Sequence, residues 1–509
     1  MGMSDLTITV KNNKVKIIDK NKTEVTIETV SDIEEKTTTS QGLYGVVVIE
    51  NCKYLIYITE ISKMQDFEGK QVFEICNVGI LNLSGSSNHR TELNDLVNFF
   101  KIPGMYYSSY PLYKETSIGK SNGDDFIFNF APLKEMEKLN PELKQFGVKC
   151  IQGFYGVENV KGIDYYLISR RSWRRTGARF FSRGSSPDGY VSNYVESEVF
   201  FKTNNTKMSY LQVRGSIPLY WYHDVMLNYT PKLVIRQKNN FAKCDAIIRN
   251  KYQDILYLNL IKDKNYEKPL YDKFNIVLKE KSCEIVNFDL NSTGSFQNKR
   301  TVFDFNMKTK KYIDEFGFKT LEDQQKGVIR TNCIDCLDRT NLSQFQISEE
   351  IIKKMCDYAK IPLYNEILKS NRRLWLNNGN HLSIQYSGTG AIKSYIVEGT
   401  CSSWSGNLKD FYKSISRYFI NRYTHGRLQD TYDILTGKNL IKRKRYPRTK
   451  LFTPRQLAFI GILVGLLTIS SFMKSKGKVL SVFKTSIICF VLLLLMMSLM
   501  RNYPKFDDD

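Results

Sequence analysis

Short runs of alternating apolar and polar residues dominate the first part of the chain and predict a β-rich module. Polar turns separate the runs, which span Ile8–Ile18, Tyr44–Glu50, Tyr54–Thr59 and Gln71–Leu83. Such alternation is typical of strands that bury one face. The stretch Ser117–Asp125, rich in Gly, Ser and Asp, is the predicted end of this module. The alternative is a surface loop inside one larger domain.

Between Phe126 and about Thr436, apolar runs of strand length alternate with segments of helical spacing, which predicts an α/β or α+β body. The clearest case is the stretch from Gly327 to Asn341, which begins as a short buried strand. A helix should follow it, because apolar residues recur at helical spacing at Leu342, Phe345, Ile351, Ile352 and Met355. The loop between strand and helix would gather backbone N–H groups and the positive end of a helix dipole into a phosphate cradle.

The end of the chain changes from a basic run to two apolar segments. No acidic residue occurs in Lys438–Arg455, and the apolar segments are Leu457–Met473 and Thr485–Met500. Each segment is near the lower limit of about 17 residues for a helix that crosses a bilayer. Together they predict a transmembrane hairpin over 457–500.

A buried helix pair in a soluble domain is the alternative to this hairpin, and Val491–Met497 argues against it because it has no polar face. Basic residues are denser in the linker 438–456 than between the two segments, so the body and the tail 501–509 should face the cytosol. Short spans suit a thin bilayer such as that of the endoplasmic reticulum. The basic linker would hold the body against an anionic lipid surface.

Composition narrows the class of protein. With 509 residues, of which 42% are hydrophobic, the chain can form two or three packed domains. A net charge of +22 predicts an anionic partner: nucleic acid, an acidic membrane or a phosphorylated substrate. Nucleic acid is disfavoured, because the basic residues gather beside the apolar segments and no recognition motif occurs. Ten cysteines without a paired framework, and no apolar leader, predict a reducing, cytosolic setting for the body.

The loop places a thiol and a guanidinium at the spacing of thiol-dependent phosphatases, Cys333-x5-Arg339, followed by Thr340. A helix N-terminus and a nearby guanidinium are expected to lower the pKa of the thiol from about 8.5. The guanidinium can pair with two phosphoryl oxygens, and water would hydrolyse the resulting phosphocysteine. Asp335 and Asp338 are the candidate proton donors, and Thr340 could hydrogen-bond the sulfur.

Cys333 and Cys336 also form a Cys-x-x-Cys pair, which is half of a zinc site or a redox pair. Zinc is disfavoured, because no second such pair exists and the four histidines are scattered, so neither a metal nor another cofactor is predicted. Resolution of an oxidised Cys333 by Cys336 is compatible with catalysis.

Six arginines lie in Arg170–Gly184, and arginine binds phosphate bidentately, so a phosphorylated ligand is one interpretation. The other is a solvated basic face or salt bridges to Glu196 and Glu198. Arg214, beside a rigid turn and aromatic residues, is a further arginine that could bind phosphate.

From Arg330 to Asn341 the chain resembles the signature of the Sac-domain phosphoinositide phosphatases, Arg-x-Asn-Cys-x-Asp-Cys-Leu-Asp-Arg-Thr-Asn, at every fixed position. Other stretches resemble family blocks, and these are Arg170–Gly184, Asp188–Glu196, Arg214–Trp221 and Ser383–Gly390. The resemblance covers about Gly42 to Leu435, and the hairpin resembles the reticulum-anchored branch of the family.

This resemblance implies an N-terminal β-rich Sac module (1–120), an α/β Cys-x5-Arg phosphatase domain (121–437) and the two-helix transmembrane hairpin. The implied activity is metal-independent hydrolysis of a membrane phosphatidylinositol phosphate, with the 4-phosphate as the expected position. The implied location is the membrane of the endoplasmic reticulum or the Golgi. Residues implied to bind substrate are Asn332, Arg179, Arg183 and Arg214. The sequence identifies no protein partner.

The chain departs from the family pattern where it has Asn377 and Asn380 in place of acids, Asn291 in place of a histidine, and His425 in place of an acid. These losses shift the proton transfer onto Asp335 or Asp338. They also raise a second hypothesis, a phosphoinositide-binding membrane-contact protein with weak catalysis. A protein phosphatase with the same thiol chemistry is a third, which a comparison of phosphopeptide and lipid substrates would separate.

Overall fold

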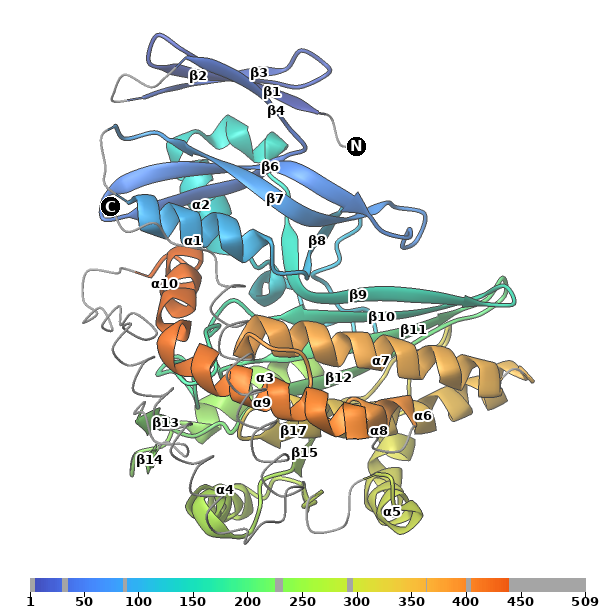
Figure 1. The fold of residues 1–509 in the computed structure, drawn as a ribbon. Coiled ribbons are helices and arrows are strands. Elements are labelled where there is room, and N and C mark those ends of the chain that lie inside the picture. Colours follow the sequence, from blue (N-terminus) through green and yellow to red (C-terminus); the bar gives the residue numbers. More distant parts are fainter. Residues whose placement is uncertain are drawn as a thin grey trace, which may run out of the picture.

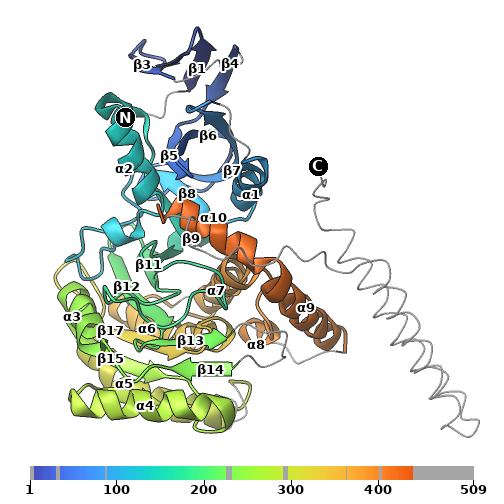
Figure 2. The ribbon, with the colours of Figure 1, turned by 90° about the vertical axis from the view of Figure 1, so that its left-hand side faces the viewer.

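The computed structural model describes residues 5–29, 35–85, 89–224, 232–290, 296–362, 364–399 and 404–438. A small sheet lies at one end of the molecule, and a long mixed sheet runs through the rest (Figure 1). Helices pack along the long sheet, both next to the small sheet and at the opposite end (Figures 1 and 2).

The small sheet has four strands in the order β3-β2-β1-β4, and these are β1 (Leu6–Lys11), β2 (Lys14–Ile18), β3 (Glu24–Glu28) and β4 (Lys36–Ser40). The predicted run Ile8–Ile18 is therefore two strands and not one. Asn12 and Asn13 form the two-residue hairpin loop between them, with φ of +49° and +57°. Asn adopts this left-handed conformation at low cost, which allows the tight reversal.

The long sheet has eleven strands in the order β16-β15-β17-β12-β11-β10-β9-β8-β7-β6-β5. Its antiparallel strands are β5 (Leu43–Ile49), β6 (Cys52–Lys63), β7 (Val72–Asn82), β8 (Met105–Ser108), β9 (Cys150–Val160), β10 (Ile163–Arg171), β11 (Val195–Lys202) and β12 (Lys207–Ser216). Its parallel strands are β15 (Asp254–Asn259), β16 (Ile285–Asn287) and β17 (Gly327–Cys333). The strands predicted at Tyr44–Glu50, Tyr54–Thr59 and Gln71–Leu83 are confirmed as β5, β6 and β7.

This sheet continues across the predicted module boundary at Ser117–Asp125, because β8 and β9 pair on either side of it. Near the end of the described chain, Tyr432 also packs its ring 5.2 Å from that of Phe99 in the first module. The two predicted domains thus share a sheet and a core, and a division near residue 120 stays a prediction.

The predicted alternation of strands and helices holds only for the second half of the body. β9 to β12 follow one another as antiparallel neighbours, and only Lys161 and Gly162 separate β9 from β10. A parallel neighbour would need a crossover of a dozen or more residues. Such crossovers appear later in the chain, where α4 (Lys268–Glu280) and α5 (Lys299–Phe316) connect β15, β16 and β17.

Helices cover both faces of the parallel part of the sheet. α5, α6 (Asp338–Ala359) and α7 (Tyr364–Ser387) share a core with Leu256 and Ile329, whereas α3 (Phe241–Tyr252) and α4 share one with Tyr257 and Val328. The other helices are α1 (Arg90–Phe100), α2 (Phe130–Leu139), α8 (Tyr395–Glu398), α9 (Trp404–Tyr423) and α10 (His425–Leu435), with 3-10 turns η1 (Asp124–Phe126), η2 (Pro141–Phe146) and η3 (Asn265–Glu267). β13 (Trp221–Asp224) and β14 (Lys232–Ile235) form a separate hairpin.

Within the described ranges, every helix is too short or too polar to cross a bilayer. The predicted hairpin at 457–500 lies outside those ranges, as do the tail and all of the basic linker after Lys438.

Candidate active site

The loop from Ile334 to Leu337 connects the central strand β17 to α6, which confirms the predicted order of strand, loop and helix. β17 lies between β15 and β12, in parallel with both, so the loop emerges where parallel strands end. Crevices at this edge of an α/β sheet are the usual place for ligands. Cys336 has a φ of +52°, which turns the chain sharply into the helix.

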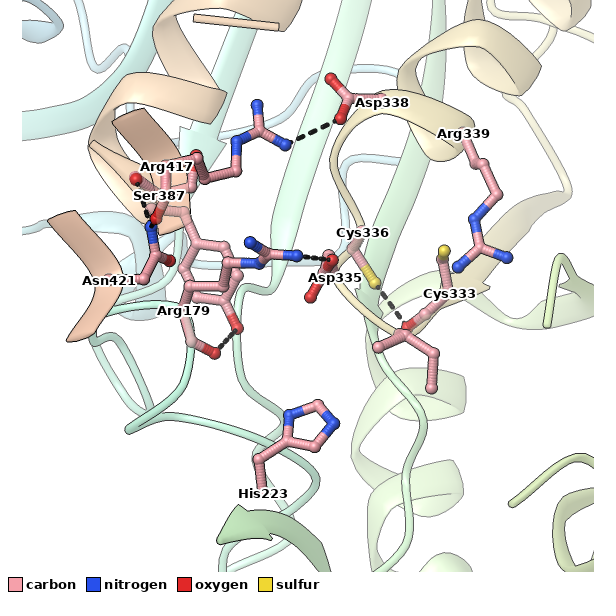
Figure 3. A network of polar contacts seen from close by, with 12 residues as sticks. Arg179, His223, Cys333, Asp335, Cys336, Asp338, Arg339, Ser387, Arg417 and Asn421 are labelled. Atoms are coloured by element: carbon pink, nitrogen blue, oxygen red, sulfur yellow. Dashed lines mark hydrogen bonds and ion pairs between the residues drawn. The ribbon is translucent and has the colours of Figure 1, made fainter. Parts of the chain in front are cut away.

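Cys333 ends β17 with only 2% of its surface exposed. Figure 3 shows the guanidinium of Arg339 pointing toward its sulfur. Burial raises the pKa of the thiol, although the charge of Arg339 acts in the opposite direction. The predicted lowering of this pKa is therefore wrong for the conformation described, because desolvation of the thiolate outweighs the nearby cation.

Arg339 is held by a carboxylate that the sequence did not single out. Its Nη1 donates to Glu267 Oε2 at 3.2 Å and its Nη2 to Glu267 Oε1 at 3.0 Å. Nη1 also donates to the carbonyl of Leu260 at 3.0 Å. Glu267 lies in no family block, and its contact with Arg339 spans 72 positions, so no short-range signal could have identified it.

Asp335 lies between two of the arginines predicted to bind substrate. Arg179 Nη2 donates to its Oδ2 at 2.6 Å, and Arg183 Nη2 donates to its Oδ1. Burial alone would raise the pKa of Asp335, but the two guanidinium groups hold it well below its usual range. Asp335 is therefore ionised and has no proton to give in this conformation, contrary to what a general acid requires.

Asp338, the other candidate acid, is anchored at the start of α6. Its Oδ2 accepts from Arg417 Nη1 at 3.0 Å, and its Oδ1 accepts from the backbone N–H of Ile392 at 2.8 Å. Arg417 comes from α9 and also donates to Ser383 Oγ at 3.0 Å. In this structure, both predicted proton donors therefore contact an arginine.

Three further predicted residues are fully buried. Thr340 has no hydrogen-bond partner for its hydroxyl among the described residues, so the expected bond to the sulfur is not formed. Asn332 lies inside β17 and donates to the carbonyl of Arg330 at 3.3 Å. Arg214 donates to Asn341 Oδ1 at 3.3 Å, and burial lowers its pKa to about 9. In this conformation none of the three faces solvent.

The six arginines of Arg170–Gly184 have different partners. Only Arg179 and Arg183 reach the loop; Arg170, by contrast, forms an ion pair with Glu198 at 2.7 Å and lies 3.7 Å from Glu196. For Arg170 the salt-bridge interpretation is therefore the correct one.

Arg183 is fixed by polar and aromatic neighbours that sequence reasoning missed. Its Nε donates to His223 Nδ1 at 3.1 Å, and its Nη1 donates to the Tyr386 hydroxyl at 3.1 Å. Burial and the charge of Arg183 lower the pKa of His223 to about 3, so this imidazole is neutral. Tyr386 lies in the block Ser383–Gly390, and the resemblance of that block to the family could have identified it as a site residue. No feature of the sequence pointed to His223.

The structure also shows the contacts of three of the four positions that depart from the family pattern. Asn380 Oδ1 accepts from the backbone N–H of Ala391 at 3.0 Å, and Asn377 receives a bond from His381 only at its carbonyl. His425 is buried with neither ring nitrogen bonded among the described residues, and burial lowers its pKa to about 3. Asn291 lies outside the described ranges.

The second cysteine, Cys336, is a buried residue of the loop itself. Its thiol donates to the carbonyl of Cys333 at 3.3 Å, and burial raises its pKa to about 12. Among the described residues, no group of three or more His, Cys, Asp or Glu side chains could hold a metal ion. Independence of metal stays a prediction.

Comparison with known proteins adds the family. Residues 41–310 match the SacI homology domain, a span that ends before Cys333. The chain is 28% identical to Phosphoinositide phosphatase SAC7 of Arabidopsis thaliana, over 79% of this chain and 75% of that protein. It is 28% identical to Phosphatidylinositol-3-phosphatase SAC1-B of Danio rerio, over 87% and 84%, and 27% identical to Phosphatidylinositol-3-phosphatase SAC1 of Saccharomyces cerevisiae, over 78% and 72%.

Proposed function

Because the chain belongs to the SacI homology domain family, we propose that it is a phosphoinositide phosphatase that uses Cys333 as its nucleophile. The observation that carries this proposal is the position of Cys333 at the end of a central parallel strand, with the guanidinium of Arg339 directed toward its sulfur (Figure 3). The names of the relatives support the substrate class.

In the proposed reaction the Cys333 thiolate attacks phosphorus, and the bond from phosphorus to the inositol oxygen breaks. Arg339 stabilises the charge that spreads over the phosphoryl oxygens. Asp338 or Asp335 protonates the departing oxygen, and water then hydrolyses the phosphocysteine. Both acids are bound to arginine in the structure, so either must leave its partner before it can act. Asp335, whose pKa is held well below its usual range, must also take up a proton.

The proposed substrate is a phosphatidylinositol phosphate. Arg179 is 20% exposed and Arg183 1% exposed beside the loop, so Arg179 is the better placed of the two to meet a headgroup. We expect the 4-phosphate to be the preferred position, whereas the relatives from Danio rerio and Saccharomyces cerevisiae are named for the 3-phosphate. The position is therefore a matter for a substrate panel.

The proposed location follows from the C-terminal segments predicted from sequence. A hairpin at 457–500 would anchor the protein in the membrane of the endoplasmic reticulum or Golgi, with the body on the cytosolic side. The basic linker would then keep the loop close to an anionic lipid surface.

The test is phosphate release by the full-length chain in detergent micelles. We expect turnover of phosphatidylinositol 4-phosphate, more slowly of the 3-phosphate, in the presence of a chelator. Cys333→Ser should abolish it, and Asp335→Asn and Asp338→Asn, assayed separately, should identify the acid. Activity that survives Cys333→Ser, or that needs a divalent ion, would overturn the mechanism.

A second candidate function is favoured by the state of the site itself. The thiol is buried with a raised pKa and Asp335 is ionised, and both of these oppose rapid turnover. A phosphoinositide-binding membrane-contact protein with weak catalysis would have such a site. Tight binding to phosphoinositide vesicles without phosphate release would favour this alternative.

A further inference from the structure

The contacts of Arg339 lead beyond the proposed function, on which the following inference rests. We infer that Glu267 is a positioning residue. It binds one edge of the Arg339 guanidinium and leaves a second edge free for a phosphoryl group. Neither the signature of the loop nor any block of family likeness includes Glu267.

Glu267 is itself rigidly placed. It ends the turn η3 immediately before α4, and only 3% of its surface is exposed. Its Oε2 also accepts from the backbone N–H of Lys262 at 2.8 Å. A carboxylate fixed both by its own turn and by burial can hold a partner in one orientation.

The donors of Arg339 can be counted, because a guanidinium has five N–H groups in a fixed plane. Nη1 uses both of its hydrogens, one toward the Leu260 carbonyl and one toward Glu267. Nη2 uses one hydrogen toward Glu267. The second hydrogen of Nη2 and that of Nε have no acceptor among the described residues, and they point the same way.

These two free hydrogens form a second fork, which matches two oxygens of a phosphoryl group. The contact with Glu267 therefore does not use up the phosphate-binding capacity of Arg339. It fixes the plane of the guanidinium, so that less side-chain freedom remains to be lost when phosphate binds. Figure 3 shows that plane beside Cys333.

The charge of Glu267 also affects the Cys333 thiol. Three side chains act electrostatically on the Cys333 thiol: Arg339 favours the thiolate, and Glu267 and Asp335 oppose it. Removal of the charge of Glu267 should thus increase the fraction of thiolate at a given pH. Loss of positioning should at the same time weaken phosphate binding and catalysis. If the ion pair only connected η3 to α6, its removal would weaken neither phosphate binding nor catalysis.

The variants are Glu267→Gln, which removes the charge at nearly constant shape, and Glu267→Asp, which keeps it. Asp95→Asn is the matched control, because Asp95 forms a remote two-bond pair with Arg427, at 2.8 and 2.5 Å. Alkylation of Cys333 by iodoacetamide in the full-length chain is followed by mass spectrometry of the Cys333 peptide. Inorganic phosphate is the protecting probe.

For Glu267→Gln we expect faster alkylation, with its pH midpoint lower by about one unit. Phosphate protection should need at least about tenfold more phosphate, and kcat/KM should fall by up to about 100-fold, mainly in kcat. Glu267→Asp should recover part of the protection, and Asp95→Asn should change only the melting temperature.

Two results would overturn the inference: unchanged phosphate protection in Glu267→Gln, or stronger protection, which would make Glu267 a competitor of phosphate. The alkylation assay does not depend on turnover. A wild-type chain that releases no phosphate from any phosphoinositide, yet shows the predicted loss of protection in Glu267→Gln, would contradict the proposed function and support the role of Glu267.

Discussion

Arg179 donates from Nη2 to Oδ2 of Asp335 at 2.6 Å, so an arginine predicted to bind the substrate is bound to an acid predicted to give up a proton. Arg183 holds the other oxygen of the same carboxylate. A phosphorylated headgroup that enters here would compete with Asp335 for both guanidinium groups. Substrate binding and release of Asp335 are thus expected to be coupled.

Asp335→Asn should lower the free energy of unfolding by about 1–3 kcal/mol, because Arg183 would lose the charge that compensates its burial. Denaturation by urea, followed by circular dichroism, measures this change. Asp263→Asn is the control: Asp263 pairs with Lys268 on the surface, where an ion pair contributes only about 0–1 kcal/mol. Equal effects of the two variants would contradict the importance of the buried pair.

Glu196 predicts a pH dependence of opposite sign to that of an ordinary carboxylate. Burial raises its pKa to about 8, whereas the unfolded chain should show a value of about 4.3. Between these values the folded state holds a proton that the unfolded state lacks, so this contribution to stability is lost as pH rises.

Glu196→Gln, which imitates the protonated form, should therefore gain stability relative to wild type between about pH 5 and about pH 8. Urea denaturation of both proteins at several pH values tests this. Glu198→Gln is the contrasting variant, since it removes the 2.7 Å partner of Arg170 and should destabilise the fold. A constant difference between Glu196→Gln and wild type across the range would contradict the raised pKa.

Arg214→Met should leave the free energy of unfolding unchanged or raise it by about 1 kcal/mol, while phosphoinositide turnover falls if Arg214 serves the substrate. Arg214 is buried, and its Nε and Nη1 have no partner among the described residues, so its charge is poorly compensated. Arg427→Met is the control, because it leaves Asp95 without its two-bond partner and should cost about 1–3 kcal/mol. Marked destabilisation by Arg214→Met would show that the arginine has a structural role.

The local pattern of apolar residues was sufficient to predict the strand and helix on either side of the loop. Apolar spacing predicted α6, and Ile351, Ile352 and Met355 are buried in it as expected. The Cys-x5-Arg spacing likewise brought Cys333 and Arg339 together, because one loop and one helical turn determine their separation.

The contacts that set the state of the site could not be predicted in this way. Glu267 reaches Arg339 across 72 positions, and Arg179 reaches Asp335 across 156. Residues so far apart in sequence come into contact only through the order of strands in the long sheet. The spacing of apolar residues does not determine that order. The expected low pKa of Cys333 was wrong for the same reason, since tertiary burial decides it.

The most direct test of the central claim is a search for phosphocysteine on Cys333. Full-length protein is mixed with phosphatidylinositol 4-phosphate, quenched in acid within one turnover and digested for mass spectrometry. We predict a phosphoryl group on the peptide that contains Cys333 and none on Cys336, with slower hydrolysis of the intermediate in whichever of Asp335→Asn and Asp338→Asn removes the acid. Phosphate release without any phosphorylated Cys333 peptide, or with the label on another residue, would contradict the account.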